Sequence, residues 1–534
     1  MKAPLQPVLP LLVLLASCGS EAESAPEILA AAPRDGWSPT AAESGFTLVA
    51  PLMSKRVYLV DMAGNAVHQW DTAEKPGEGN YLTERGTLLR SMRVPDHPTF
   101  QDAGGFGGRI QEIDWDGTVL WDFSWDSESG LNHHDIELLP NGNLLFNAWD
   151  RTTREAALAL GRDPELLEGE EFWAGAVYEV RPTPPEGGEI VWSWHAIDHL
   201  VQNLDESLPN YGDPAEHIAR IDINGDRDEE EASEEEQAEE EAQQAALGYG
   251  GTTADGEDEE GEGEEEEEED PEDAARRDRV RGADWMHQNA VAYNAELDQI
   301  AISPRRFDEI WVIDHGITRE EAKGEKGDLL YRWGNPYAHG MGFWDQRKLH
   351  GQHNIHWIPE GHLGAGNFLV FNNGSRTRRW SSVDEFFAPR DSAGTYLREE
   401  GAPFGPREFE WTYEQGEEGE FYAPFISGVQ RMPGGTTLIC AGPAGWVFEV
   451  TPAGEIVWDW KSPFGPLPGE EEEDMADYST AMFRAPRYAA DHPGIVALRE
   501  KGAAIPLEAG SGPATNQREE PEEEEGSEEE SEEG

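Results

Sequence analysis

The chain contains little cysteine, few basic residues and no long apolar segment. Only two of its 534 residues are cysteines, Cys18 and Cys440, which excludes a disulfide-rich scaffold. Lys and Arg number 40 against 109 Asp and Glu, and a net charge of -69 would repel phosphate groups, so we expect no nucleic acid partner. Beyond the first residues, no apolar run is long enough for a membrane-spanning helix. The 37 % of apolar residues suffice for one large domain or two ordinary ones.

The first 18 residues are typical of an export signal. A lysine at position 2 precedes an apolar run at 8–15, which is too short to span a bilayer. The small residues before Cys18 resemble the cleavage box of bacterial lipoproteins, in which the cysteine becomes the acylated first residue. We therefore predict lipidation at Cys18 and a periplasmic or cell-surface protein, an outer-membrane lipoprotein held by a lipid anchor. An ordinary cleaved signal is the alternative.

Two kinds of segment alternate through most of the chain. One is a hairpin of alternating apolar residues around an Asp-Gly or similar turn, clearest from Arg109 to Phe123. Similar hairpins lie at 57–70, 176–194 and 446–460. The other kind begins near a polar side chain. Its starting positions are Phe46, Tyr81, His134, His287, His353 and Ser427.

Pairing the two kinds of segment gives six units of four strands. Such a repeat predicts an all-β fold, a six-bladed β-propeller, in which nineteen Trp would pack between strands. The fourth and fifth outer hairpins are irregular, so seven blades is an alternative count. A two-sheet sandwich is the alternative fold, but it gives no reason for a repeated four-strand unit.

Acidic tracts interrupt this pattern. Residues 228–273 contain 25 acids and no Lys or Arg, and 519–533 contain 11 more. Such tracts cannot bury enough apolar surface to fold alone. The predicted organisation is a lipoprotein-type signal peptide at 1–18, a linker at 19–44, a β-propeller catalytic domain at 45–490 with an acidic disordered insertion at 227–278, and an acidic disordered tail at 505–534.

The inner strands of a propeller line its central channel, so the residues at their starts meet at one mouth. This would gather His134, His287, Asn289 and His353, together with Arg305 at the end of the strand that His287 begins. His133 is an alternative to His134, because its distance from the following turn matches that of His287. A donor-rich cationic pocket suits a tetrahedral anion such as a phosphate or sulfate group. A neutral imidazole is also a competent nucleophile near pH 7.

Metal binding is a second interpretation of the same residues. Three histidines can bind Zn²⁺, but no HExxH motif or cysteine pair accompanies them, so we expect no metal and no cofactor. The alternating oxygens of Asp222, Asn224, Asp226 and Asp228 could hold Ca²⁺ weakly. We favour a plain acidic turn, because a well-placed bidentate glutamate is lacking.

The segments together resemble the bacterial arylsulfate sulfotransferase family, which does not use a nucleotide sulfate donor. The similarity covers most of residues 45–490, and its motifs are specific mainly through their order. They are His134-Asp-Ile-Glu-Leu-Leu-Pro-Asn-Gly-Asn, His287-Gln-Asn289 with Ser303-Pro-Arg305, Gln352-His353 before Asn367-Phe-Leu-Val-Phe-Asn-Asn-Gly374, and Phe483-Arg-Ala-Pro-Arg-Tyr488.

The resemblance implies an exported six-bladed propeller that moves a sulfuryl group between phenols through a sulfated histidine. By position, His353 is implied as the nucleophile. His287, Asn289 and Arg305 are implied as holders of the sulfuryl oxygens, and His134 as the partner that assists charge or proton movement at the phenolic oxygen. The expected partners are a small-molecule aryl sulfate and a phenol.

Two other functions fit a propeller. A non-catalytic cell-surface propeller would bind a protein or glycan, but it needs no cluster of histidines and arginine. A quinone-dependent dehydrogenase shares hairpins with tryptophan and Asp-Gly turns. It would need acidic metal ligands, for which the sequence has no matching set.

Overall fold

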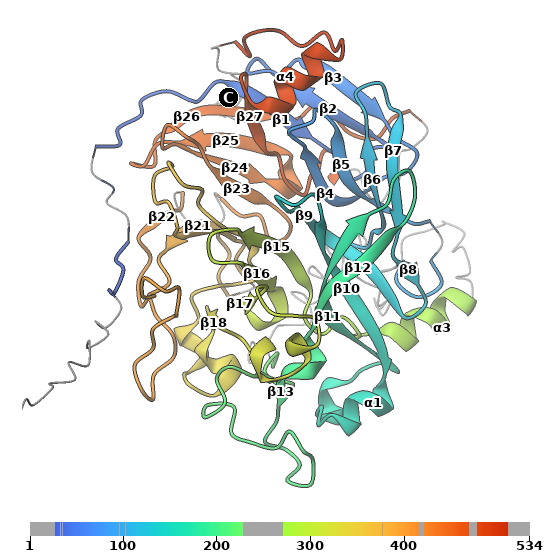
Figure 1. The fold of residues 1–534 in the computed structure, drawn as a ribbon, viewed down its shortest axis with the longest axis vertical. Helices are drawn as coiled ribbons and strands as arrows, with labels where there is room; N and C mark the ends of the chain where they lie inside the picture. Colours follow the sequence, from blue (N-terminus) through green and yellow to red (C-terminus); the bar gives the residue numbers. More distant parts are fainter. Residues whose placement is uncertain are drawn as a thin grey trace, which may run out of the picture.

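The computed structural model describes residues 27–227, 271–415, 421–468 and 478–510, apart from residues 32, 33, 35, 96, 102 and 376. They form a six-bladed β-propeller (Figure 1), as the repeat predicts. Cys18 lies outside the described residues, as do 228–270 of the expected insertion and 511–534 of the expected tail. Among the described residues, no helix is long and apolar enough to cross a membrane.

The first three blades come from the N-terminal half of the chain. Blade 1 contains β27 (Arg487–Ala489), β1 (Gly45–Val49), β2 (Arg56–Val60) and β3 (Ala66–Asp71). Blade 2 contains β4 (Pro76–Leu82), β5 (Leu88–Arg93), β6 (Gly108–Ile113) and β7 (Val119–Ser124). Blade 3 contains β9 (Gly130–Leu138), β10 (Leu144–Thr153), β11 (Glu171–Pro182) and β12 (Gly188–His195), with the short β8 (Asp126–Ser127) beside β9.

The other three blades follow in order. Blade 4 contains β15 (Gln288–Asn294), β16 (Gln299–Pro304), β17 (Ile310–Asp314) and β18 (Tyr331–Trp333). Blade 5 contains β19 (His353–Trp357), β20 (Phe368–Asn372), β21 (Ser382–Phe386) and β22 (Trp411–Tyr413). Blade 6 contains β23 (Gly428–Arg431), β24 (Thr437–Ala441), β25 (Trp446–Val450) and β26 (Ile456–Lys461). Outside the blades lie the two-stranded parallel sheet of β13 (Leu200–Val201) and β14 (Ile221–Asp222), and the helices α1 (Arg154–Ala159), α3 (Pro271–Val280) and α4 (Pro493–Glu500).

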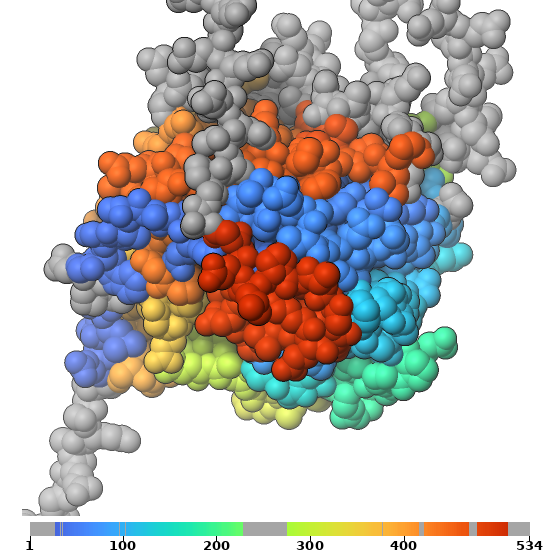
Figure 2. Space-filling model, turned by 90° about the horizontal axis from the view of Figure 1, so that it is seen from above, coloured from blue at the N-terminus to red at the C-terminus, as the bar shows by residue number. Residues whose placement is uncertain are grey.

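The two ends of the propeller domain close the ring together. The C-terminal β27 pairs with β1, with Thr47 opposite Arg487, so β27 is the innermost strand of blade 1. The expectation that the inner segment of this unit begins near Phe46 is therefore wrong, because Phe46 lies on the second strand. With only three residues, β27 is too short to show an alternating pattern. Figure 2 shows the C-terminal segment that contains α4 packed against the N-terminal strands, where Ile495 and Leu498 are buried.

Tryptophans on the outer strands join each blade to the next. In every blade, an indole N–H donates to a backbone carbonyl in the outer loop of the following blade, at 2.7–3.1 Å. The pairs are Trp70 with Asp114, Trp121 with Gly187, Trp192 with Ile317, Trp333 with Pro406, Trp411 with Pro452 and Trp458 with Met62. The last pair returns from blade 6 to blade 1. The high tryptophan content therefore serves contacts between blades as well as packing within them.

Candidate active site

The inner strands carry bulges that turn polar side chains toward the axis. The register of β4, β9, β15 and β19 against the next strand shifts within the strand, and a bulge re-aims the side chains around it. A residue with a left-handed backbone lies in or just before the inner strand of five blades. These residues are Glu78 (φ 92°), His134 (φ 53°), His287 (φ 46°), Asn354 (φ 55°) and Ser427 (φ 85°). Side chains other than glycine rarely adopt such angles, and such residues cluster at functional sites.

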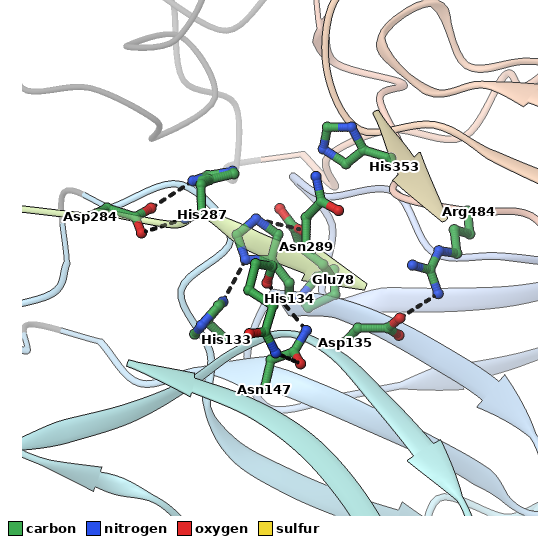
Figure 3. A network of polar contacts seen from close by, with 12 residues as sticks. Glu78, His133, His134, Asp135, Asn147, Asp284, His287, Asn289, His353 and Arg484 are labelled. Atoms are coloured by element: carbon green, nitrogen blue, oxygen red, sulfur yellow. Dashed lines mark hydrogen bonds and ion pairs between the residues drawn. The ribbon is translucent and has the colours of Figure 1, made fainter. Parts of the chain in front are cut away.

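His134 and His287 lie against each other. Their ring centroids are 4.6 Å apart at 80° (Figure 3). Nδ1 of His287 is 2.6 Å from Oδ2 of Asp284, and its backbone N–H donates to Oδ1 of the same carboxylate. Burial would raise the pKa of Asp284, but the charge and hydrogen bond of His287 outweigh it and lower this pKa to about 2. Asp284 therefore fixes the orientation of His287 as an ionised carboxylate.

The neighbouring His133 takes a different role. Its ring stacks on Trp149 with centroids 4.0 Å apart at 12°, and its Nδ1 is 2.7 Å from Nδ1 of His134. Of the two adjacent histidines, His134 thus contacts His287, while His133 contacts His134 and Trp149. The bulge at this point decides the choice, which sequence spacing left open.

Asn373 fixes the tautomer of His353. The amide nitrogen of Asn373 donates to the carbonyls of Ala423 (2.7 Å) and Ile426 (2.9 Å), so its Oδ1 must be an acceptor. This oxygen lies 2.8 Å from Nδ1 of His353, which therefore carries the proton. Nε2 consequently presents a lone pair. It is buried, and no described residue forms a hydrogen bond with it.

The surroundings of His353 keep its ring neutral. Burial is the largest cause that lowers its pKa well below 6.5, and the charge of Arg305 is the next. The charges of His287 and Arg484 act in the same direction, against the hydrogen bond with Asn373. The ring is therefore unprotonated at neutral pH, the form in which an imidazole can act as a nucleophile.

Arg305 lies between the strand that follows His287 and the segment that leads to His353. Its backbone N–H donates to the carbonyl of His287 (3.2 Å). A Cβ atom built on Gly351 would lie 3.5 Å from Nε and from Nη2 of Arg305. No carboxylate among the described residues forms an ion pair with this half-buried guanidinium. It can therefore serve an anion that approaches His353.

Asn289 is buried between the same strands. Its Nδ2 donates to the carbonyl of Gln352 (2.8 Å), next to His353. This bond uses one of the two amide hydrogens and leaves the other for a ligand. Figure 3 shows Asn289 beside His134, between His287 and His353. All five residues predicted for the site, His134, His287, Asn289, Arg305 and His353, are thus held together at one end of the inner strands.

Three residues that the sequence reasoning missed also lie here. Oε2 of the buried Glu78 is 3.7 Å from Nε2 of His134. Asn373 orients His353, and Arg484 approaches from the segment before β27. Glu78 and Asn373 are single polar residues without a repeated spacing. For Glu78, its place in an inner strand was the one available signal.

The two metal interpretations concern the three histidines and the acidic turn that begins at Asp222. Among the residues that the structure describes, no group of three or more His, Cys, Asp or Glu side chains is arranged around a metal position. The guanidinium of Arg162 pairs with Asp226, and Oδ1 of Asn224 accepts from the backbone of Asp163 (2.8 Å). Protein donors thus occupy these oxygens of Asn224 and Asp226.

Buried neutral histidines should make the fold sensitive to acid. Burial lowers the pKa of His133 to about 3 and that of His356 to about 4, whereas an unfolded chain titrates near 6.5. The unfolded state therefore binds protons first, and stability falls as the pH drops below about 6.5. At pH 5.5, each such histidine is expected to remove about 1.4 kcal/mol from the free energy of unfolding.

Urea denaturation of the wild type and of His356→Gln at pH 7.5 and 5.5 checks this expectation. The variant should lose about 1.4 kcal/mol less than the wild type between the two pH values. An equal loss in both proteins would contradict a neutral His356 in the folded protein.

The sequence matches a known protein family. The model of the family described as Arylsulfotransferase (ASST) matches residues 37–462. No curated protein matches the chain. A protein of unknown function from Bacteroides caccae is 10 % identical, with 84 % of this chain and 100 % of that chain covered and a TM-score of 0.39. A catalytically inactive virginiamycin B lyase from Staphylococcus aureus is 8 % identical, with 80 % and 87 % covered and a TM-score of 0.33. At this distance, neither structure carries information on the site.

Proposed function

Because the chain belongs to the arylsulfotransferase family and is an aryl-sulfate sulfotransferase, we propose that it transfers a sulfuryl group from a phenolic sulfate ester to a phenolic acceptor through a sulfated His353. The observation that carries this mechanism is the tautomer of His353. Asn373 holds its Nδ1, so the buried Nε2 presents a lone pair beside Arg305 and His287. A nucleophile in this state needs no base to activate it.

The transfer takes place in two displacements. In the first, the Nε2 lone pair attacks sulfur, an N–S bond forms, and the S–O bond to the aromatic ring breaks, with the electron pair leaving on the phenolate oxygen. In the second, the oxygen of another phenol attacks sulfur, and the N–S bond returns its electrons to Nε2. The product is a new aryl sulfate, and the enzyme is regenerated without water.

The neighbouring side chains stabilise these steps. Arg305 and the second amide hydrogen of Asn289 donate to the sulfuryl oxygens as charge moves onto them. His287 donates its Nδ1 hydrogen to Asp284, so in its neutral form Nε2 has no hydrogen to donate to these oxygens. His134 has its pKa lowered well below 6.5 by burial and then by the charge of His287. As a neutral imidazole, it can take the proton of the incoming phenol and then release it to solvent, which restores the enzyme.

An assay with an aryl sulfate that releases a coloured phenol tests this function. Colour should appear only when a second phenol is present as acceptor. Donor without acceptor, quenched with alkali, should leave one sulfuryl group on the protein, and peptide mass spectrometry should place it on His353. Steady release without any acceptor would mean a sulfatase, and no release with any phenolic pair would exclude the transfer.

A glycine beside His134 provides a prediction for this site. A Cβ on Gly105 would lie 2.2 Å from both Cε1 and Nε2 of His134. Gly105→Ala is therefore expected to displace the ring and to lower kcat/KM about a hundredfold, as misplaced catalytic groups do. Gly142→Ala is the matched control, because Gly142 has a similar positive φ but no atom within 4 Å of its Cβ position. Equal activity in both variants would contradict the role of His134.

The cellular location is proposed on the sequence alone. We infer that the protein is exported and attached to a membrane by a lipid on Cys18, with the propeller facing the periplasm or the cell surface. In the producing bacterium, the protein should partition into detergent, and Cys18→Ser should release it into the aqueous phase. Detergent partitioning of the Cys18→Ser protein would exclude this anchor.

A further inference from the structure

Arg484 reaches the site from the segment that closes the ring. This segment leads from blade 6 into β27, and the ring of Phe483 lies 6.2 Å from His134 and 6.4 Å from His353, between centroids. The guanidinium of Arg484 lies over the Phe483 ring, 4.5 Å from its centroid. Two consecutive residues of one segment therefore border both histidines.

One nitrogen of this guanidinium is held by the protein. Nη1 is 2.8 Å from Oδ2 of Asp135 and also donates to the hydroxyl of Tyr81. Tyr81 and Arg484 both line a cavity of about 790 Å³ that extends along the inner strands, past His356 and Val429. Figure 3 shows the ion pair with Asp135 on the side of the cluster away from His287.

The other edge of the guanidinium has no partner among the residues that the structure describes. Nε and Nη2 are both buried, and no described residue accepts a hydrogen bond from either. Leaving a buried donor unsatisfied costs about 1–3 kcal/mol. Two parallel N–H groups on one edge form the fork that binds two oxygens of a carboxylate, phosphate or sulfate group.

Through Phe483, the guanidinium lies near the two histidines that are proposed to act on the sulfuryl group. The charge of Arg484 lowers the pKa of both His353 and His134. Gly428 sets its position, because a Cβ there would lie 2.8 Å from Cγ of Arg484 and 3.1 Å from Oδ1 of Asn354. The ion pair with Asp135 then fixes the direction of the fork.

We propose that Arg484 is a second guanidinium that binds the transferred sulfuryl group, through its Nε and Nη2. Arg305 contacts the group from the segment before His353, and Arg484 contacts it from the ring-closing segment, so two cations share the three sulfuryl oxygens. The assignment rests on the proposed function for its reaction. Anion binding by Arg484 can be tested separately from the reaction. A protein that does not turn over should still bind an aryl sulfate or the more highly charged aryl phosphate.

The first test measures binding without reaction. In a His353→Ala background, calorimetry with 4-nitrophenyl sulfate and 4-nitrophenyl phosphate is compared with and without Arg484→Met. Loss of the fork should weaken both ligands at least about tenfold, and the phosphate more than the sulfate. Unchanged affinity for both ligands in a folded Arg484→Met protein would overturn the assignment, whether or not the wild type transfers sulfuryl groups.

The second test measures turnover. Arg484→Met should lower kcat/KM about a hundredfold, the loss typical of a donor that stabilises developing charge. Arg484→Lys keeps the charge beside Asp135 but loses the fork, so it should recover only part of the activity. Millimolar guanidinium should partly restore Arg484→Ala, which a purely structural arginine would not show. Full activity in Arg484→Lys without any such rescue would assign Arg484 to anchoring alone.

A further variant covers the case in which loss of Arg484 prevents folding. Gly428→Ala keeps the guanidinium and shifts it, and it should lower kcat/KM at least about tenfold with little change in melting temperature. Gly142→Ala is again the matched control, because its Cβ would meet no atom within 4 Å, and it should stay within about threefold of the wild type. Wild-type activity in Gly428→Ala, with a crystal structure showing Arg484 displaced, would overturn the proposal.

Discussion

Replacing His353 with alanine is expected to abolish sulfuryl transfer, with a loss of at least about a thousandfold in kcat, because the covalent intermediate forms on this residue. Phenol release in the presence of an acceptor measures the loss. Mass spectrometry of donor-treated protein should show no sulfated peptide.

His356→Gln is the matched control for this variant. His356 lies on the same strand, but it lines the cavity beyond the site, and its Nδ1 bonds to the carbonyl of Asn354 (3.1 Å). We expect its activity at pH 7.5 to stay within about twofold of the wild type, as for a change away from the reacting atoms. If both variants lost activity alike, or if sulfation persisted in His353→Ala, the intermediate would form elsewhere.

Arg305→Met is expected to lower kcat/KM by about a hundredfold to a thousandfold, or about 2.7–4 kcal/mol, which is typical for loss of one donor to a developing anion. Arg305→Lys keeps the charge without the two-pronged geometry and should fall between the variant and the wild type. The rate of protein sulfation in a single turnover, measured by rapid quench, locates the effect in the chemical step. The stability of the variant should change little, because Arg305 has no ion pair among the described carboxylates.

The neighbouring Arg306 offers a control of equal charge. Its side chain is exposed, whereas that of Arg305 is half-buried. Arg306→Met should therefore change kcat/KM by no more than about threefold at physiological salt, where exposed charges are screened over about 8 Å. Similar losses in the two variants would point to a general field effect instead of a contact with the sulfuryl group.

The fold could be predicted because its repeated hairpins are local features. Alternation around a turn, as from Arg109 to Phe123, needs only neighbouring residues, and the structure forms β6 and β7 there. Ring closure could not be predicted in the same way. It pairs Thr47 with Arg487 across almost the whole chain, and β27 is too short to show a pattern. The position expected for the first inner strand was wrong for that reason.

The candidate site was predictable where a side chain stands at a repeated position. Inner-strand starts meet at one end of the channel, so His134, His287 and His353 follow from the propeller itself. Their supporting residues do not follow from it. Asn373 acts on His353 through a side-chain amide that two backbone carbonyls orient. Arg484 acts through the edge of its guanidinium that does not pair with Asp135. Both depend on contacts between distant segments, which spacing in one sequence does not reveal.

The six tryptophan hydrogen bonds between blades determine how the protein should unfold on heating. Each indole forms a hydrogen bond with the following blade. The bond from Trp458 to the carbonyl of Met62 connects the last blade to the first. A single sheet therefore cannot come away while its two neighbours stay in place. Melting should occur as one sharp event for the whole propeller, and catalysis should disappear at the same temperature as the compact shape. Heating would thus leave no intermediate species with a loosened but working pocket.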